Sequence, residues 1–176
     1  MANVDSKKRK LNGLIIIVIL LLGTPESLRG QWLLVPMDRS QQDHLRAYGL
    51  TYWTLAQQEK AEWLLNYRGG SFLLPDREDV RREAAFRGVS IEMMNAIDEA
   101  RMRAMVASSN MEAVPLEKAP QVAIYTPPNS TPWDDAVTMA LEYAGIEYDK
   151  IWDGDVLEGN LSEYEWVHLH HEDFTG

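Results

Sequence analysis

The last third of the chain shows the clearest pattern of apolar and polar residues. Residues 121–125 form a short β-branched and aromatic run that ends at Pro127-Pro128, and this pattern predicts a strand. Apolar residues then recur every three or four positions from Trp133 to Ala144, and Gly145 follows, so we expect an amphipathic helix there. Thr131 is the expected N-cap of that helix.

Two further strands are expected after this helix, at residues 148–152 and 165–170, with a turn at Asp153-Gly154-Asp155 between them. A strand, a helix and a strand at this spacing indicate parallel pairing with a right-handed crossover. Open sheets of this kind bind ligands beyond the carboxyl ends of their strands. In this chain, those ends are residues 126–131, 153–155 and 168–175.

The pattern between residues 31 and 107 predicts seven elements in the order β-α-β-β-α-β-α. The first, residues 31–37, is a continuous apolar run typical of a strand buried on both faces. The others are expected as a helix capped by Ser40, strands at 63–67 and 71–74, a helix from Asp76 to Gly88, a strand at 89–93, and a helix capped by Asn95.

These elements divide the chain into four segments. They are a signal peptide at residues 1–30, an N-terminal α/β lobe at 31–110, a linker at 111–120 that contains Pro115, and the start of a βαβ domain at 121–176. The fold class is therefore α/β. The two halves form either two lobes or one sheet that both of them build.

The leader consists of the basic cluster Lys7–Lys10 followed by the apolar run Leu11–Gly23. This is the arrangement of a secretory signal, and we expect cleavage near Gly30. The apolar run would extend over about 20 Å as a helix, which is too short for a hydrocarbon layer of about 30 Å. We therefore expect an exported protein, periplasmic or extracellular, with no stable membrane insertion after cleavage.

The amino-acid composition excludes some classes of partner and of site. The 176-residue chain has a formal charge of −10, and such an acidic surface argues against binding to nucleic acid or anionic lipid. The chain contains no cysteine. This excludes disulfides, thiolate zinc sites and a cysteine nucleophile within these residues.

The sharpest group of chemically active residues lies at the predicted end of the last strand. His168, His170 and Glu172 alternate along it and would share one face, where they could hold a metal ion. A polar rim explains them better, so we predict no metal and no cofactor. We expect His168, His170 and His171 as candidate general acids or bases, with Glu172 and Asp173 contacting a ligand.

A second candidate is the run Arg68-Gly69-Gly70-Ser71. Its glycines would let backbone amides approach an anion, and Arg68 would supply a fork for a substrate carboxylate. A plain hairpin turn is the simpler explanation. The chain lacks the glycine patterns of nucleotide-binding loops.

The run Trp133-Asp134-Asp135 could also present carboxylates to a ligand. Helix capping accounts for Asp134, and exposure to solvent accounts for Asp135.

Five longer segments carry a family resemblance, and they are Trp32–Asp38, Asp43–Gly49, Trp63–Leu73, Pro132–Val137 and His168–Gly176. With these segments the chain resembles a family of exported bacterial proteins commonly labelled asparagine synthetase B, over essentially the whole stretch after the leader. The enzyme of that name needs a cysteine after the initiator Met and an SGGxDS-type loop, whereas this chain has Ala2 and lacks the loop, so asparagine synthesis is not carried over.

The resemblance implies a fold like that of class I glutamine amidotransferases. Such a fold is a flavodoxin-like parallel sheet whose core opens with the strand at Val122 and whose nucleophile sits on an elbow after a later strand. We therefore expect the chain to be the N-terminal part of such a protein, incomplete at the C-terminus, with any nucleophile beyond Gly176. The resemblance implies an amidotransferase-like hydrolase acting on a small molecule.

A non-catalytic exported or envelope protein that keeps the fold and binds a ligand is the alternative. The sequence leaves open whether the protein is an enzyme, and it does not specify the oligomeric state. A Cys or Ser on a downstream strand-to-helix elbow would separate the two functions.

Overall fold

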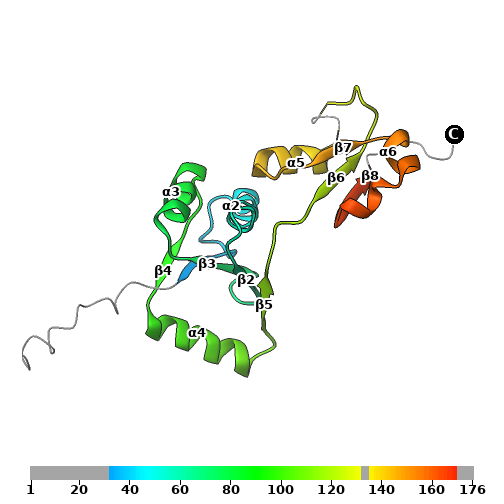
Figure 1. The fold of residues 1–176 in the computed structure, drawn as a ribbon. Helices are drawn as coiled ribbons and strands as arrows, with labels where there is room; N and C mark the ends of the chain where they lie inside the picture. Colours follow the sequence, from blue (N-terminus) through cyan, green and yellow to red (C-terminus); the bar gives the residue numbers. More distant parts are fainter. Residues whose placement is uncertain (1–31, 132–134, 170–176) are drawn as a thin grey trace, which may run out of the picture.

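A computed structural model of the chain describes residues 32–131 and 135–169 (Figure 1). These residues form a mixed α/β structure with two separate sheets, one of five strands and one of three. The α/β class is therefore confirmed, and the alternative of one sheet built by both halves is wrong. No helix in these two ranges is long and apolar enough to cross a membrane.

The first sheet has the strand order β4-β1-β3-β2-β5, and all its pairings are antiparallel. The order of its elements along the chain agrees with the sequence prediction, with one strand added at the end. The parallel pairing expected of the fold is therefore confined to the second sheet. The elements are β1 (Trp32–Val35), α2 (His44–Ala56), β2 (Ala61–Leu65), β3 (Ser71–Pro75), α3 (Glu78–Arg87), β4 (Glu92–Met94), α4 (Ala96–Ser108) and β5 (Glu112–Leu116).

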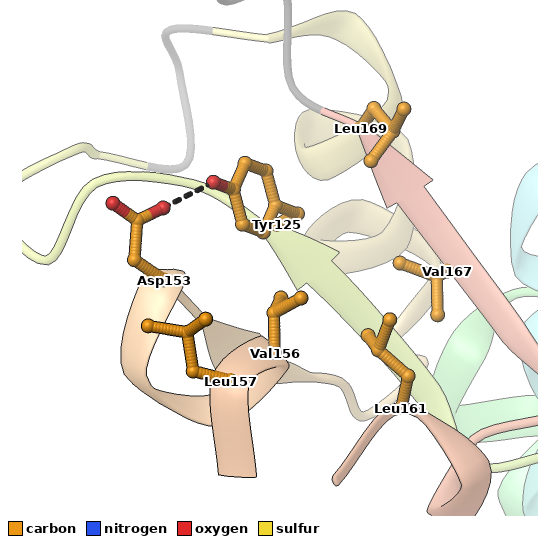
Figure 2. Close-up of a pocket in the computed structure, with 7 residues that line it drawn as sticks. All are labelled: Tyr125, Asp153, Val156, Leu157, Leu161, Val167 and Leu169. Carbon is orange, nitrogen blue, oxygen red and sulfur yellow. Dashed lines mark hydrogen bonds between the residues drawn. The ribbon is translucent and has the colours of Figure 1, made fainter. Parts of the chain in front are cut away.

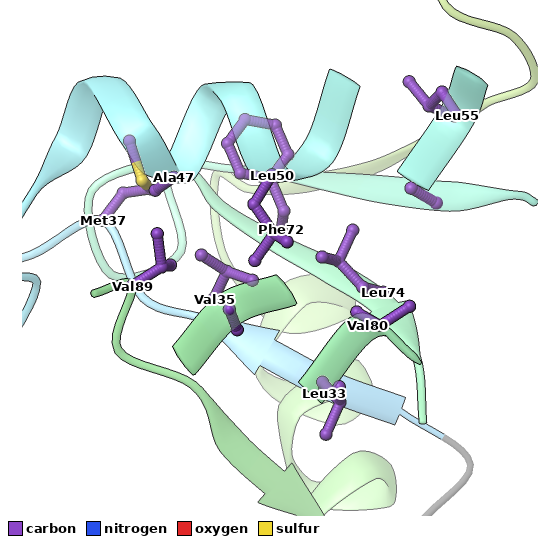
Figure 3. Packing of buried hydrophobic residues seen from close by; sticks show 12 residues of the cluster. Leu33, Val35, Met37, Ala47, Leu50, Leu55, Phe72, Leu74, Val80 and Val89 are labelled. Carbon is purple, nitrogen blue, oxygen red and sulfur yellow. The ribbon is translucent and has the colours of Figure 1, made fainter. Parts of the chain in front are cut away.

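Helices cover both faces of this sheet. Leu33 and Val35 of β1 pack with residues of α2 and α3 in one buried cluster (Figure 3), whereas Leu34 packs with Met102 and Val106 of α4 in another. The three β1 residues are at most 2 % exposed. This confirms the prediction of a strand buried on both faces. Full burial of each side chain contributes about 1.5–3 kcal/mol to folding.

The segment expected as a linker contains β5. This strand pairs antiparallel with β2 from Ala61↔Leu116 to Leu65↔Glu112. Pro115 lies within it and can be accommodated because β5 is an edge strand, where a missing N–H can face away from the sheet. A half-exposed edge strand that contains proline has no clear alternation of apolar residues, and the sequence pattern therefore missed it.

Two of the predicted helix starts in the first lobe are shifted. Helix α2 begins after Asp43, whose carboxylate accepts a hydrogen bond from the amide three residues further on, and not after Ser40. Helix α3 begins after Arg77 instead of Asp76. The prediction for α4 is confirmed, because the Asn95 side chain accepts from two amides of its first turn.

The second sheet has the strand order β7-β6-β8, and β6 pairs parallel with both neighbours. The predicted parallel pairing of the strand at residues 121–125 with the next strand is therefore confirmed. The expected turn at residues 153–155 instead opens a short helix, whose start is fixed by the Trp152 amide donating to Asp155 Oδ2 over 2.8 Å. The elements are β6 (Val122–Tyr125), α5 (Ala136–Ala144), β7 (Asp149–Ile151), α6 (Asp153–Glu158), the 3₁₀ helix η2 (Asn160–Glu163) and β8 (Trp166–Leu169).

The two faces of the second sheet differ. Val122 and Ile124 of β6 pack against Leu141 of α5. The register pairs Ile124 with His168 of β8, so this histidine lies on the face that α5 covers. The alternate residues of β6 and β8, Tyr125 among them, face α6 and η2.

The two lobes touch where α2 meets α5. Gly49 of α2 lies so close to α5 that a Cβ atom built on it would be 1.8 Å from the carbonyl oxygen of Ala144. The Tyr143 hydroxyl donates to Asp43 Oδ2 over 2.5 Å, and the Arg46 guanidinium lies 4.8 Å from the centre of the Tyr143 ring. Helix α5 is therefore shared between the packing of both lobes.

Candidate functional site at the carboxyl ends of the parallel strands

His168 and Asp135 meet at the carboxyl edge of the second sheet. His168 Nε2 lies 3.2 Å from Asp135 Oδ1. The two side chains are only 20 % and 11 % exposed. Parallel pairing of β6 with β8 brings them together, since it places the end of β8 beside the start of the helix that follows β6. The sequence predicted that the carboxyl end of the last strand lies at the ligand-binding edge, and the structure adds that the start of α5 lies beside it.

Asp135 is the N-cap of α5. Its Oδ1 accepts hydrogen bonds from the amides of Val137 and Thr138 over 2.7 and 3.0 Å. The prediction that Thr131 caps this helix is therefore wrong, and so is the prediction that Asp135 is merely solvated. The sequence does not distinguish Asp134 from Asp135 as the N-cap, because adjacent aspartates offer the same capping oxygen. Trp133 and Asp134 lie outside the described residues.

The charge of Asp135 is set by opposing effects. Burial on its own raises the pKa of the carboxyl, but hydrogen bonds from the Thr138 amide, the His168 ring and the Val137 amide lower that pKa to about 2. Asp135 is therefore ionised near neutral pH and acts only as an acceptor. His168 consequently carries a proton on Nε2, and in the neutral ring Nδ1 is the basic nitrogen.

The loop after β6 is anchored to the end of β7. The Thr126 amide donates to the carbonyl of Ile151 over 3.0 Å. The hydroxyl oxygen Oγ1 of Thr126 lies 2.5 Å from Oγ of Ser130. Lys150 Nζ donates to the Ser130 carbonyl over 2.7 Å. This edge of the sheet therefore presents hydroxyl, ammonium and imidazole groups from three neighbouring segments.

An apolar hollow of about 510 Å³ opens on the opposite face of the sheet (Figure 2). At its rim the Tyr125 hydroxyl donates to Asp153 Oδ1 over 2.5 Å, and the Tyr125 ring stacks on Trp152 with centroids 4.8 Å apart. Sequence reasoning missed this feature because residues 153–155 were expected to form a turn. The hollow is lined by Tyr125, Asp153, Val156, Leu157, Leu161, Val167 and Leu169.

Arg68 lies in the first lobe, in the turn between β2 and β3. Its Nε donates to Asp38 Oδ2 over 2.7 Å, while Nη1 and Nη2 donate to the two carboxylate oxygens of Glu92 over 2.7 and 2.9 Å. The hydrogen bond from Arg68 holds the pKa of the Asp38 carboxyl well below its usual range. All of these partners are in the first lobe, so the structure does not bring Arg68 to His168.

The glycines after Arg68 serve the turn itself. Gly69 has φ +84°, and a Cβ atom on it would be 2.3 Å from the carbonyl oxygen of Met37. The Met37 amide in turn donates to the Arg68 carbonyl over 3.2 Å. A ligand carboxylate would have to displace Asp38 or Glu92 from the guanidinium, so the geometry favours the hairpin explanation over the anion site.

The other candidates at the strand end, His170, His171, Glu172 and Asp173, lie outside the described residues, and their roles stay predictions. Within residues 32–131 and 135–169, no three His, Cys, Asp or Glu side chains are grouped so that they could hold a metal ion. The contact between His168 and Asp135 in the second range pairs an imidazole with a carboxylate.

Comparison with known proteins gives no relative for this site. No family model matches the chain, and no curated protein or solved structure shows significant similarity to it.

Proposed function

We propose that the chain is the N-terminal part of an exported, amidotransferase-like hydrolase of the family labelled asparagine synthetase B, in which His168 acts as a general acid and base. The observation that carries this proposal is the His168–Asp135 contact of 3.2 Å at the carboxyl edge of a parallel sheet. An imidazole oriented by a carboxylate is a common general acid and base in enzymes. The carboxyl edge is where open α/β sheets bind their ligands.

The strand order supports a flavodoxin-like fold for the second lobe. Numbered within that lobe, β7-β6-β8 is the order 2-1-3, which is how a flavodoxin-like sheet of order 2-1-3-4-5 begins. In the proposed protein, further strands continue this sheet, and one of them carries the nucleophile on its elbow.

The chemical roles follow from the hydrogen bonds. Asp135 fixes the ring through Nε2 and leaves Nδ1 to accept a proton from the attacking nucleophile or water. The resulting imidazolium is stabilised by the Asp135 carboxylate and can return the proton to the departing amine. Such an oriented acid–base pair accelerates amide hydrolysis by about 10²–10⁴-fold.

Export is the second part of the proposal. It is supported by the basic cluster at residues 7–10 followed by an apolar run that is too short to span a bilayer comfortably. The absence of cysteine and the formal charge of −10 are compatible with a protein of the periplasm or the medium.

The test is an assay of ammonia release from glutamine, asparagine and other small amides, with the protein expressed from its complete reading frame. We expect turnover that falls by at least about 10²-fold in both His168→Ala and Asp135→Ala. Arg46→Ala, in the first lobe, serves as the control and should retain activity. A complete frame without a Cys or Ser on a strand-to-helix elbow would eliminate the hydrolase.

A non-catalytic ligand-binding protein is the second candidate. The stacked pair Tyr125 and Trp152, with Asp153 bonded to the Tyr125 hydroxyl, favours it because aromatic rings beside a carboxylate suit carbohydrate binding. This candidate predicts saturable binding of a sugar that is lost in Trp152→Ala and unchanged in His168→Ala. The hydrolase predicts the opposite dependence.

A further inference from the structure

Methionines are concentrated in one part of the first lobe. The chain contains eight of them and no cysteine, and five of the eight lie between positions 93 and 111. Strand β4 carries Met93 and Met94, while α4 carries Met102 and Met105, which are three positions apart and therefore neighbours on the helix surface. Much of the sulfur of this chain is thus gathered where β4 packs against α4.

These four side chains line one cavity of about 270 Å³ between β4 and α4. Its floor is buried, since Met94 is 6 % and Met102 is 2 % exposed, and the two pack in the same apolar cluster. Met105 and Met93 at its rim are 51 % and 70 % exposed. All the described residues that line the cavity lie between positions 34 and 105, so its walls come from strands, a turn and a helix of the first lobe.

Core packing accounts for only part of this arrangement. A methionine side chain is flexible and fills irregular gaps, which explains the buried Met94 and Met102. Met105 and Met93 are too exposed to fill a gap. They instead place two more thioethers at the rim of a cavity whose floor already contains two.

Thioether groups give this cavity a specific metal chemistry. A thioether is a soft, uncharged ligand, and soft sulfur ligands favour ions such as Cu(I). Each methionine has three rotatable bonds, so sulfur atoms that line one cavity can turn toward a common point. Magnesium or calcium would require oxygen ligands, and the described residues contain no group of three His, Cys, Asp or Glu that could hold a metal ion. The cavity therefore suits a soft monovalent cation.

The charges around the cavity allow a cation to enter. Two cationic side chains line it, Arg68 and Arg101. Arg68 is hydrogen-bonded to Asp38 and Glu92. Arg101 Nη1 lies 3.9 Å from Asp98 Oδ1. Carboxylates therefore offset both positive charges, and the formal charge of −10 on the whole chain attracts cations.

We propose that Met94, Met102 and Met105 form a binding site for Cu(I), with Met93 at the rim as the first sulfur that an entering ion meets. Because a thioether has no proton to lose, binding releases none and does not weaken in mild acid. The site belongs to the first lobe and does not involve His168, so it is independent of the proposed hydrolase. The sequence expectation of no metal concerns the histidine cluster at the last strand, which is a different place in the chain.

The first test uses Ag(I), a redox-stable ion that shares the preference of Cu(I) for sulfur, added as silver nitrate to the full-length protein. The methionine methyl groups carry a carbon-13 label and are followed by NMR. We expect the signals of Met94, Met102 and Met105 to shift with one common midpoint, at an Ag(I) concentration at least about tenfold below that which shifts Met139. Met139 is the matched control, because it is 51 % exposed on α5, in the other lobe. Equal midpoints for Met139 and Met105 would overturn the proposal.

The pH dependence of Ag(I) binding separates sulfur from other ligands. The affinity at pH 5 should equal that at pH 7, since a thioether does not titrate in this range. An imidazole, with a pKa of about 6.5, would be protonated at pH 5 and would release the ion. A loss of affinity of about tenfold or more at pH 5 would show that sulfur is not the ligand.

The last test removes the sulfur atoms. Met102→Leu and Met105→Leu nearly preserve size and apolarity, so each should leave the circular dichroism spectrum and the urea midpoint almost unchanged. Each should still weaken Ag(I) binding by at least about tenfold, whereas Met139→Leu should have no effect on the site. If Met102→Leu fails to fold, the exposed position decides through Met105→Leu. Unchanged affinity in a folded Met105→Leu would show that these methionines serve packing alone.

Discussion

Arg87 of α3 donates a hydrogen bond from Nη1 to the carbonyl oxygen of Ala144, the last residue of α5, over 2.7 Å. The two residues belong to different lobes. A carbonyl in the last turn of a helix has no partner within that helix, and a cation is favoured beside it. Arg87 Nε is held by Glu83 over 2.7 Å, which orients the guanidinium. The first lobe therefore caps a helix of the second.

Replacement of this cap should destabilise the protein. We expect Arg87→Met to lower the free energy of unfolding by about 1–3 kcal/mol, because it removes a charged donor from a partly buried carbonyl. Urea denaturation followed by circular dichroism measures the change. Arg82→Met, on an exposed position of the same helix, should change stability by less than about 0.5 kcal/mol. Equal effects of the two variants would show that the Ala144 contact contributes nothing.

The close approach of Gly49 to Ala144 predicts that alanine at position 49 destabilises the protein. Gly→Ala in a helix normally stabilises by about 1 kcal/mol. At Gly49 we expect a net loss of about 1–3 kcal/mol, because the added Cβ would lie 1.8 Å from the Ala144 carbonyl oxygen and would push α5 away.

Gly154 of α6 provides the matched control, since a Cβ there has no atom within 4 Å. Gly154→Ala should leave thermal stability unchanged or raise it. A neutral or stabilising Gly49→Ala would mean that α2 and α5 do not pack as described.

The lowered pKa of Asp135 predicts a dependence of stability on pH. Its pKa in the folded state, about 2, lies below the value of 3.8 for the free carboxyl. The carboxylate therefore stabilises the fold fully above pH 4, and this contribution is lost as the pH falls from about 4 to 2.

Asp135→Asn keeps an oxygen for the helix cap and removes the charge. Urea midpoints of the two proteins should differ at pH 7, and the difference should shrink as the pH falls from about 4 to 2. A difference that stays constant across this range would show that the ionised form of Asp135 has no special stability.

Arg68 should behave as a structural residue. Because its guanidinium joins Asp38 to Glu92, we expect Arg68→Met to lower the urea midpoint without altering the affinity for any ligand that binds near His168. Arg68→Lys should recover only part of the loss, since one ammonium group cannot replace the fork-shaped pairing with Glu92. A variant with normal stability but lost ligand binding would restore the predicted role as a substrate anchor.

The sequence by itself determined the order and type of most of the elements, although it missed β5 and the helices after β7. Strand β1 is a continuous apolar run, α4 has an Asn95 cap, and β6 is followed by a helical stripe of apolar residues. Each of these signals depends on residues at most a few positions apart, so it can be read along the chain. Parallel pairing of β6 with β7 also followed from the sequence, because neighbouring strands that are joined through a helix usually pair in parallel.

Tertiary structure alone decided the partners of the polar residues. Asp135, and not a neighbour, meets His168 because β8 pairs with β6, a choice that joins residues 33 positions apart. Arg68 became a structural residue because folding placed two carboxylates from distant segments beside it. β5 became a strand because the open edge of β2 was available to it. Such long-range pairings depend on how whole elements pack, and the pattern of residues a few positions apart does not specify them.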